Sequence, residues 1–364
     1  MNQAIENIDS LKSTDQDPEF VFKNSVYYSL IELINDNCKD PLYSMGMYHF
    51  SKPGKMVRSS IIFKLGRIYN LDQNILLKWA MSCELLHEAS LIHDDLQDGD
   101  KTRREQATIW SKFSKAQAVN MGDFLLMLSY LPLEHLPQNL TPLHSKTALK
   151  LVQGQASEFE LTKNQTLRGP SLNTLYGSCI TDTYLDCVRG KTGALFSSLA
   201  SGVARLSNCK RDEIQFLEQI YLDLGIIFQV QDDLLDLFGD KKRGFQGSDI
   251  QEGKCSVLIA KHYDEYPEDK IMIQGILNKP RQDTSVQDIE KIKTLFLDKG
   301  TLVLCLEFLE NQIADLNKFI KKDANLNFNT SIFNHIQKLI AHILEPINNI
   351  YIGSEIDAPN SSQN

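Results

Sequence analysis

The chain has 364 residues, 42% of them hydrophobic, and carries a formal net charge of -9 with a pI near 5.4. This apolar content is ample for a large core. The negative charge argues against nucleic acid as a partner, because phosphate backbones are bound by a basic surface. Any phosphate that the chain binds is therefore expected to be small and locally held.

The seven cysteines are odd in number, scattered, and include no Cys-x-x-Cys pair. This pattern indicates a reduced, cytoplasmic protein with neither a disulfide framework nor a zinc site. The first twenty residues are polar and acidic, and lack the basic and apolar regions of a secretory signal. We predict no membrane span, because polar residues interrupt every apolar window of about 20 residues.

Apolar residues recur at helical spacing through most of the chain, and Gly or Pro falls mostly between the recurring stretches. We expect helices over 20–36, 56–70, 74–98, 115–132, 143–162, 172–187, 191–206, 211–238, 254–263, 285–297, 301–321 and 330–350. Strand alternation is nowhere sustained. The sequence predicts an all-α fold, a single large helical bundle around a central cavity at 19–351, with disordered tails at 1–18 and 352–364.

Two of the expected helices end in the same acidic spacing, Asp-Asp-x-x-Asp. The acids are Asp94, Asp95 and Asp98 in the first cluster and Asp232, Asp233 and Asp236 in the second. Because residues four apart share a helix face, the outer acids of each cluster point together, and the middle acid lies about 100° around the helix. The turns before both clusters are apolar almost all around, which is typical of a buried helix.

Carboxylates held together in a partly dry place raise one another's pKa unless a cation lies between them. Magnesium is the natural candidate, because it takes oxygen ligands and is usually held by one or two carboxylates plus substrate phosphates. Two facing clusters would hold several such ions and, through them, a diphosphate. A single acidic cluster would more often be a solvated outer face of a helix.

Basic residues accompany the acids. Lys55 and Arg58 follow a Pro-Gly break, near an expected helix start, where backbone N–H groups favour anions. Met56 in place of Ser or Thr excludes a Walker phosphate loop. Arg103 and Arg104 follow the first cluster, and each guanidinium group can bind phosphate oxygens through two parallel hydrogen bonds.

Further polar residues lie on the acidic helices or at helix starts. His87 precedes Asp94 by two helical turns on the same face, although a lone His in an apolar helix is usually a satisfied core residue. Gln229 precedes Asp232 by three residues and shares its face in the same way. Lys191 and Thr192 begin another helix, and Lys254 follows a glycine. Each lysine alone has an ordinary surface position as a fair alternative.

From about Lys52 to Lys261, these ordered motifs resemble the trans-prenyl diphosphate synthase family, which has the all-α isoprenoid synthase fold. The resemblance implies an Mg²⁺-dependent prenyltransferase that condenses isopentenyl diphosphate head-to-tail with an allylic prenyl diphosphate. It implies that the six acids bind about three Mg²⁺ ions. Asp94, Asp98, Lys191, Asp232 and Lys254 would be catalytic.

The same resemblance divides the remaining polar residues between the two substrates. The allylic diphosphate would be bound by Arg103, Lys191, Thr192, Gln229 and Lys254. Isopentenyl diphosphate would be bound without metal by Lys55, Arg58, His87 and Arg104. The chain departs from the family pattern where Glu105 and Ala107 replace the usual Gly and Pro, and where Ser256-Val257-Leu258 replaces Thr-Leu-Pro. A homodimer is expected, with Val119–Leu131 as an interface helix or simply as core.

Chain length is expected to depend on Ala89 and Ser90, one turn before the first cluster. In the family, an aromatic residue there resembles a floor that stops growth near C15. Small residues predict a product of C20 or longer, although a facing helix can close the same tunnel lower down. The tunnel's shape should decide this, because each added isoprene unit gains only a few kcal/mol, at ~0.8 kcal/mol per CH₂.

Two other functions remain open from the sequence. A class I terpene cyclase would also use facing acidic clusters and Mg²⁺, but it has no need of a second anion pocket. A non-catalytic subunit that binds prenyl diphosphates and modulates a partner enzyme is the other alternative. The intact acids at all six positions argue against it.

Overall fold

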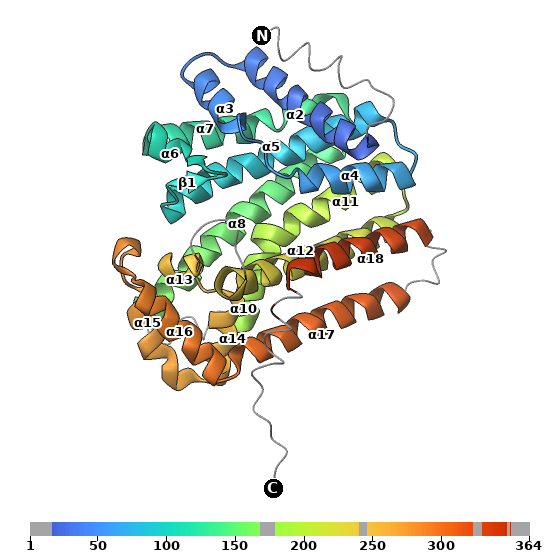
Figure 1. The fold of residues 1–364 in the computed structure, drawn as a ribbon. Coiled ribbons are helices and arrows are strands. Elements are labelled where there is room, and N and C mark those ends of the chain that lie inside the picture. The colour runs from blue at the N-terminus through green and yellow to red at the C-terminus, as the bar shows by residue number, and fades with distance from the viewer. Residues whose placement is uncertain (1–16, 168–178, 240–245, 323–329, 348–349, 351–364) are drawn as a thin grey trace. The chain divides into compact units, whose positions relative to one another are not determined.

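The computed structural model describes residues 17–167, 179–239, 246–322, 330–347 and 350. This part of the chain is almost wholly helical, which confirms the predicted all-α class (Figure 1). The chain divides into two compact units, residues 1–148 with 198–218, and residues 149–197 with 219–364. Three helices contribute residues to both units: α8 (Leu140–Leu167), α11 (Ala194–Leu206) and α12 (Arg211–Phe238).

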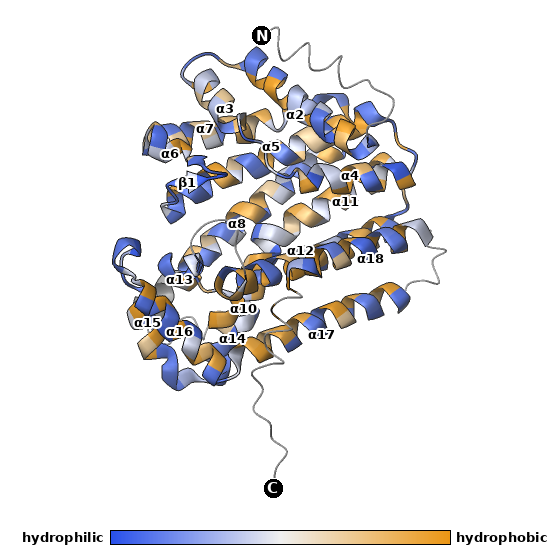
Figure 2. Ribbon diagram, viewed as in Figure 1, coloured by the Kyte–Doolittle hydropathy of each residue, from blue (hydrophilic) through white to orange (hydrophobic). Residues whose placement is uncertain are grey.

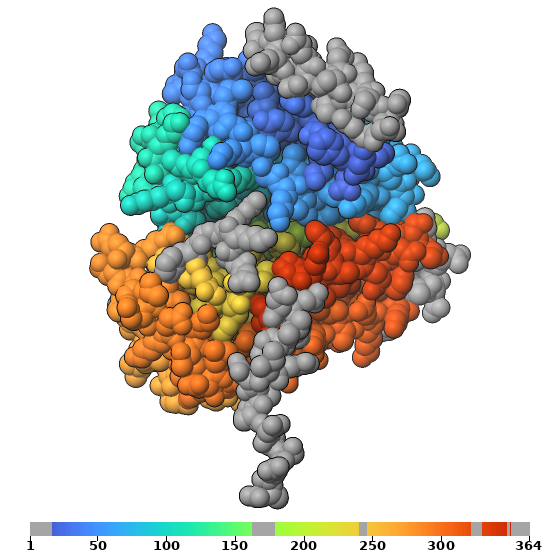
Figure 3. All heavy atoms as spheres, in the orientation of Figure 1, coloured from blue at the N-terminus to red at the C-terminus, as the bar shows by residue number. Residues whose placement is uncertain are grey.

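Unit 1 is organised around one long buried helix. The elements of this unit are α2 (Pro18–Asn37), α3 (Leu42–Phe50), α4 (Val57–Ile68), α5 (Gln73–Asp98), β1 (Thr102–Arg103), β2 (Gln106–Ala107), α6 (Ile109–Lys112), α7 (Lys115–Leu128) and the 3-10 turn η1 (Leu131–His135). Helix α5 contacts α2, α4, α6 and α7. In Figure 3 the side chains of α2–α4 and of α6–α7 form a continuous surface.

Helix α5 begins and ends where local chemistry requires it. The Asp72 carboxylate accepts hydrogen bonds from the N–H groups of Asn74 and Ile75, which caps the first turn. Gly99 ends the helix with φ at 75°, a conformation that glycine adopts without strain. In between, Trp79 is fully buried and donates its indole N–H to the Leu199 carbonyl of α11 at 3.3 Å. The burial along α5 confirms the expected buried helix.

Unit 2 is built from shorter helices. Its elements are α10 (Ile180–Val188), the π-helical turn η2 (Arg189–Gly193), α13 (Ser248–Gln251), α14 (Val257–Glu265), η3 (Pro267–Asp269), α15 (Lys270–Leu277), η4 (Arg281–Asp283), α16 (Val286–Asp298), α17 (Thr301–Lys322), α18 (Thr330–Leu344) and η6 (Glu345–Ile347). Helix α14 packs against α10 and α17, and α16 packs against α17. Figure 2 shows apolar and polar residues alternating around α17 and α18, as amphipathic helices require.

The expected helices appear with small shifts of their ends, within the described residues. The range 172–187 lies partly outside those residues, and α10 begins at Ile180. The short helices α3, α6, α13 and α15 were not predicted, because fewer than three turns give too little periodicity to detect. The prediction of no strands is wrong at one place, since β1 and β2 pair as an antiparallel hairpin.

The predicted domain limits concern parts of the chain that are only partly described. The predicted tails 1–18 and 352–364 lie outside the described residues, apart from residues 17 and 18, and α2 already begins at Pro18. The single domain expected over 19–351 stays a prediction. Among the described helices, none combines the length and the apolar character needed to cross a membrane.

Candidate functional site

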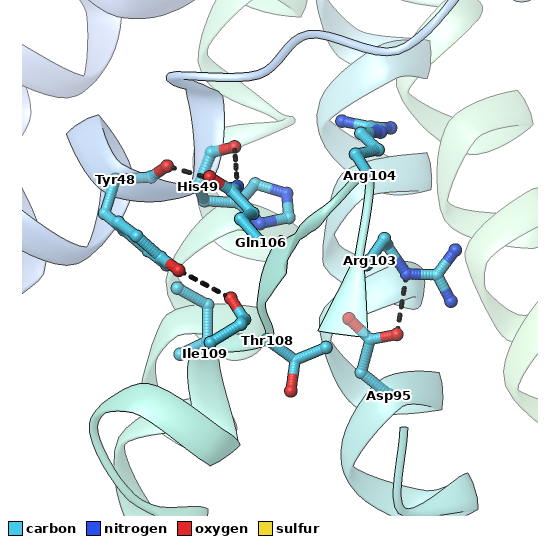
Figure 4. Close-up of a pocket in the computed structure, with 9 residues that line it drawn as sticks. Tyr48, His49, Asp95, Arg103, Arg104, Gln106, Thr108 and Ile109 are labelled. Atoms are coloured by element: carbon cyan, nitrogen blue, oxygen red, sulfur yellow. Dashed lines mark hydrogen bonds and ion pairs between the residues drawn. The ribbon is translucent and has the colours of Figure 1, made fainter. Parts of the chain in front are cut away.

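The first acidic cluster lies in the last two turns of α5, in unit 1. Asp95 is only 3% exposed, and its Oδ1 accepts a hydrogen bond from Arg103 Nε at 2.6 Å (Figure 4). Burial raises the pKa of Asp95 to about 6, although Arg103 acts to lower it. Asp94 and Asp98 are both partly exposed. The middle acid therefore turns inward and the outer pair outward, as their helical spacing predicts.

The hairpin after this cluster positions the two arginines. Arg103 pairs with Gln106 across the hairpin, so Arg104 and Glu105 form the two-residue turn. Both turn residues have positive φ, 52° and 61°, which a type I′ turn requires and which glycine adopts most readily. Figure 4 shows Arg103 turned toward Asp95 and Arg104 at the far end of the hairpin. Glu105, the departure noted in the sequence, therefore occupies a strained backbone position.

Arg104 is held by a buried carboxylate. Its Nη2 donates to Glu88 Oε1 at 2.8 Å, and its Nη1 donates to the Lys52 carbonyl at 3.3 Å. A Cβ on Gly54 would lie 2.7 Å from Arg104 Nη2, so the guanidinium lies close against the backbone of this glycine. The second oxygen of Glu88, Oε2, lies 2.7 Å from His49 Nε2. Burial alone would raise the pKa of Glu88, but His49 and Arg104 together hold it below its usual range.

Arg58 and His87 lie beside this group. The Nε of Arg58 is inaccessible to solvent and has no hydrogen-bond acceptor among the described residues. Burial, with a further contribution from Arg58, lowers the pKa of His87 well below its usual value, so its imidazole is neutral. Glu84 Oε1 accepts from the Ser59 N–H and hydroxyl at 3.0 and 2.6 Å. Lys55, just before α4, is exposed.

A small pocket adjoins the hairpin and the first acidic cluster (Figure 4). Its volume is about 10 Å³, which is room for roughly one water molecule. It is lined by Tyr48, His49, Asp95, Arg103, Arg104, Gln106, Ala107, Thr108 and Ile109. Both arginines and the buried acid of the first cluster thus belong to one polar region of unit 1.

The second acidic cluster lies near the end of α12, in unit 2. Asp232 is exposed, whereas Asp233 is buried. Asp233 Oδ2 accepts from the Tyr184 hydroxyl at 2.7 Å and from the Val257 N–H at 2.8 Å, and its Oδ1 accepts from Gln229 Nε2 at 2.9 Å. Burial raises the pKa of Asp233 to about 6. Its partners in these bonds are all neutral donors.

Asp236 is also buried, and the start of α13 holds its carboxylate. Ser248 Oγ donates to Asp236 Oδ1 at 2.5 Å, and the Asp249 N–H donates to Oδ2 at 3.0 Å. Burial, together with the nearby charges of Asp236 and Asp233, raises the pKa of Asp249 well above its usual value. This crowding of carboxylates favours a bound cation. Asp249 was missed in the sequence, although it lies in the same short segment as Lys254.

Lys191 and Thr192 lie in the π-helical turn η2, which interrupts the helical path between α10 and α11. Such turns often occur at functional sites. Thr192 Oγ1 donates to Gln229 Oε1 at 2.8 Å, so Thr192, Gln229 and Asp233 form one hydrogen-bonded chain. Lys191 Nζ pairs with Glu158 Oε2 at 2.7 Å. Two residues expected at the allylic diphosphate, Thr192 and Gln229, are thus bonded to the second cluster, and Lys191 precedes Thr192 in the same turn.

Lys254 is the remaining residue of unit 2 that is expected to bind the allylic diphosphate. Its Nζ lies 2.6 Å from Glu252 Oε2, and the other oxygen of Glu252 pairs with Arg281 at 3.1 Å. Lys254 also acts to lower the pKa of Asp249, which shows that it lies near the crowded acids.

The donor set of each cluster fits Mg²⁺, with substrate oxygens included. Among the described residues, no three His, Cys, Asp or Glu side chains come together as a ready-made metal cage. Mg²⁺ rarely uses such a cage, because it retains waters and is bound through one or two carboxylates plus phosphate oxygens. The accessible acids are Asp94 and Asp98 in unit 1 and Asp232 in unit 2.

Sequence reasoning missed the buried acids that hold the cationic residues of unit 1. Glu84 and Glu88 are four residues apart on α5, within a stretch that was expected to be buried. Buried carboxylates require donors or cationic partners, so this pair was a detectable signal. His49 gave no such signal in the sequence, because it lies in the short helix α3.

Comparison with known proteins matches residues 39–295 to the family described as polyprenyl synthetase. A short chain isoprenyl diphosphate synthase of Methanocaldococcus jannaschii is 28% identical over 262 residues, 70% of this chain and 76% of that protein. A geranylgeranyl diphosphate synthase of Saccharolobus solfataricus is 29% identical over 273 residues, 74% of this chain and 80% of that protein.

A solved structure shares the fold. The crystal structure of a geranylgeranyl pyrophosphate synthetase from Pyrococcus horikoshii has a TM-score of 0.74 at 25% identity, covering 88% of this chain and 95% of that one. Further relatives are named farnesyl and decaprenyl diphosphate synthases, so the relatives' names span several product lengths. The family match covers more than half of the chain and includes both acidic clusters. The chain therefore belongs to the polyprenyl synthetase family and is a prenyltransferase.

Proposed function

We propose that this prenyltransferase condenses isopentenyl diphosphate with an allylic prenyl diphosphate, head-to-tail and dependent on Mg²⁺, to give an all-trans product. One observation carries the proposal. The buried Nε of Arg58 has no acceptor among the described residues, and it lies beside Arg104 and the neutral His87 in the unit that holds the first acidic cluster. A buried guanidinium donor without a partner is costly, and an anionic ligand would satisfy it.

The allylic diphosphate would be bound through Mg²⁺ ions that the acids of the two clusters hold. The six acids would hold about three Mg²⁺ ions. Asp94, Asp98 and Asp232 are accessible, whereas Asp95, Asp233 and Asp236 are buried and would also stabilise the helix ends that carry the cluster. When bound, Mg²⁺ supplies positive charge where the leaving diphosphate becomes negative. The residues that would contact that diphosphate are Arg103, Lys191, Thr192, Gln229 and Lys254.

Isopentenyl diphosphate would occupy the cationic group of Lys55, Arg58, His87 and Arg104. A neutral imidazole can donate one hydrogen bond to a phosphate oxygen, and the guanidinium groups can donate two each. With its diphosphate fixed there, the double bond attacks the allylic cation, and the proton lost afterwards goes to the departing diphosphate. No nucleophilic side chain is needed.

The cationic group and the accessible acids also argue against the two alternative functions, a terpene cyclase and a non-catalytic subunit. A class I terpene cyclase ionises one diphosphate and has no use for a second anion pocket. A non-catalytic subunit would not need accessible acids in both clusters, whereas Asp94, Asp98 and Asp232 are at least partly exposed. Both observations favour the condensing enzyme.

We propose a product of C20 or longer. Ala89 is 2% exposed, and Ser90 is half-buried with its hydroxyl bonded to the His87 carbonyl at 2.7 Å, so neither small side chain supplies a bulky floor. The variant Ala89→Phe should shorten the main product by at least one isoprene unit. Mass spectrometry of the products measures this, and an unchanged product length would show that another element closes the tunnel.

We also propose a cytoplasmic homodimer that binds no nucleic acid. The outer face of α7 supports an interface, because Val119 and Met127 are apolar and 43% and 62% exposed. Light scattering of the purified protein tests the dimer, and Met127→Lys should weaken it. A monomeric wild type would contradict this part of the proposal.

The reaction itself is tested by incubating the purified protein with C5, C10, C15 and C20 allylic diphosphates. Each is supplied with or without isopentenyl diphosphate, and with Mg²⁺ or EDTA. We expect elongated prenyl diphosphates only when Mg²⁺ and isopentenyl diphosphate are both present. Hydrocarbon products without isopentenyl diphosphate would favour the cyclase, and activity only with a partner chain would favour the regulatory subunit.

A further inference from the structure

Unit 1 contains a chain of three polar residues, and neither the family motifs nor the proposed function assigns a role to two of them, His49 and Glu88. His49 on α3, Glu88 on α5 and Arg104 in the hairpin turn are far apart in sequence, yet they join through the two oxygens of one carboxylate. The side chains of His49 and Glu88 are each 8% exposed, and that of Arg104 is 17% exposed.

We infer that Glu88, locked by His49, is a positioning residue that holds the guanidinium of Arg104 in place for the diphosphate of isopentenyl diphosphate. This inference rests on the proposed function and extends it to two residues outside the family's motifs. Glu88 does not contact the substrate. It acts through Arg104.

The geometry explains why Arg104 needs such a partner. Arg104 lies in a two-residue turn with positive φ, so its own backbone does not favour the position it occupies. The bond to Glu88 uses Nη2, and the bond to the Lys52 carbonyl uses Nη1. A guanidinium carries five N–H donors in a rigid fork, so donors remain for a phosphate after both bonds are made.

His49 restricts Glu88 in turn. With Oε2 bonded to His49 and Oε1 bonded to Arg104, the buried carboxylate has one favoured orientation. The pKa of Glu88 is held below its usual range, so the carboxylate keeps its charge at any pH at which the enzyme would act. A protonated or rotated Glu88 would leave Arg104 with only the weaker bond to Lys52.

The test is steady-state kinetics of Glu88→Gln with each substrate varied in turn. The amide keeps the shape of the side chain but removes its charge, so the bond to Arg104 weakens. We expect KM for isopentenyl diphosphate to rise about tenfold, because hydrogen bonds to charged groups contribute at least that much. KM for the allylic diphosphate should change less than about twofold, since Arg103 is held separately by Asp95.

A double-mutant cycle shows whether Glu88 acts through Arg104. In the Arg104→Gln background, Glu88→Gln should raise KM for isopentenyl diphosphate no further. The matched control is Glu19→Gln, which removes the carboxylate of an ion pair elsewhere in unit 1, 3.1 Å from Lys64 Nζ. This control should leave both KM values unchanged.

His49 provides a second, independent variant should Glu88→Gln fail to fold. His49→Leu removes the bond to Glu88 and should raise KM for isopentenyl diphosphate. His49→Gln offers a donor at the same place and should restore most of the loss. A merely structural role would lower the melting temperature without changing the two KM values differently.

The outcomes separate this inference from the proposed function. An active wild type whose Glu88→Gln and His49→Leu variants keep the normal KM for isopentenyl diphosphate would overturn the inference alone. The inference would also be overturned if Glu88→Gln raised KM for isopentenyl diphosphate equally in the wild type and in the Arg104→Gln background. A wild type that never consumes isopentenyl diphosphate would overturn the proposed function and, with it, the inference.

Discussion

The two acidic clusters share one sequence spacing but balance their buried charge differently. In unit 1 the inward acid, Asp95, is paired with the cation Arg103. In unit 2 the inward acids, Asp233 and Asp236, are bonded to hydroxyl, amide and backbone donors, none of which is charged. The spacing does not decide burial by itself, because Asp98 is partly exposed whereas Asp236, at the equivalent position, is buried. The neighbouring segments determine which acids are covered and what compensates their charge.

This difference predicts unequal demands for a cation. The first cluster has a built-in positive charge in Arg103, whereas the second brings Asp233, Asp236 and Asp249 together, with Lys254 acting to lower the pKa of Asp249.

The largest effect is expected where an accessible acid is neutralised. Asp94→Asn and Asp232→Asn should each lower kcat by about 10²- to 10³-fold, as expected when charge stabilisation of the leaving group is lost. Initial rates at saturating substrates measure this. The control Asp298→Asn, at an exposed position on α16, should keep wild-type activity. If Asp232→Asn were fully active, the second cluster would have no role at the diphosphate.

The next effect is a pH dependence that originates from the burial of Asp233, which its neutral hydrogen-bond donors offset only in part. The pKa of Asp233 is about 6 in the folded protein and near 3.8 unfolded, so the folded state binds more protons between these values. The contribution of Asp233 to the free energy of unfolding is therefore fully present below pH ~4. It is lost as pH rises through ~6, which lowers the free energy of unfolding by up to about 3 kcal/mol.

Replacement of Asp233 isolates this contribution. In Asp233→Asn, the loss of unfolding free energy between pH 4 and 7 should be smaller than in the wild type. Urea denaturation in the presence of EDTA measures both proteins, with Asp298→Asn as the matched control. If the unfolding free energy changed equally with pH in the variant and the wild type, burial would not raise the pKa of Asp233.

A third experiment removes one partner from each inward acid. Arg103→Gln leaves Asp95 buried without a cation and should lower the unfolding free energy by about 2–3 kcal/mol. Tyr184→Phe removes one of three neutral donors from Asp233 and should lower it by about 1–2 kcal/mol. Chemical denaturation at pH 7 compares them. If Tyr184→Phe lost more unfolding free energy than Arg103→Gln, the neutral donor would matter more to its buried acid than the cation does.

The sequence was enough to predict the long helices, because these follow from helical periodicity. Periodicity also separates Asp95 from Asp94 and Asp98, but it does not predict that Asp236 is buried while Asp232 is exposed. It was enough to identify Arg103 beside the first cluster, since the two lie only a few residues apart. It did not show that Asp236 is bonded to the start of α13, or that Glu88 joins His49 to Arg104. Those contacts depend on tertiary packing between segments that local periodicity does not relate.

The hairpin that brings Arg103 to Asp95 contains a strained backbone position. Glu105 has φ at 61°, where a side chain is disfavoured by about 1–2 kcal/mol and glycine is not. Glycine loses more backbone freedom on folding, so Glu105→Gly should stabilise the protein by a net ~0.5–1 kcal/mol. Its exposed pair with Lys52, at 3.8 Å, contributes little to this balance.

The control is Glu105→Ala, which removes the same charge but keeps a Cβ at positive φ. Thermal melts of the three proteins should place the glycine variant highest and leave the alanine variant close to the wild type. If both variants were equally stabilised, the charge of Glu105 and not the backbone would be responsible. In that case the compensation of the first cluster would be free of conformational strain, and the two clusters would differ only in the charge of their partners.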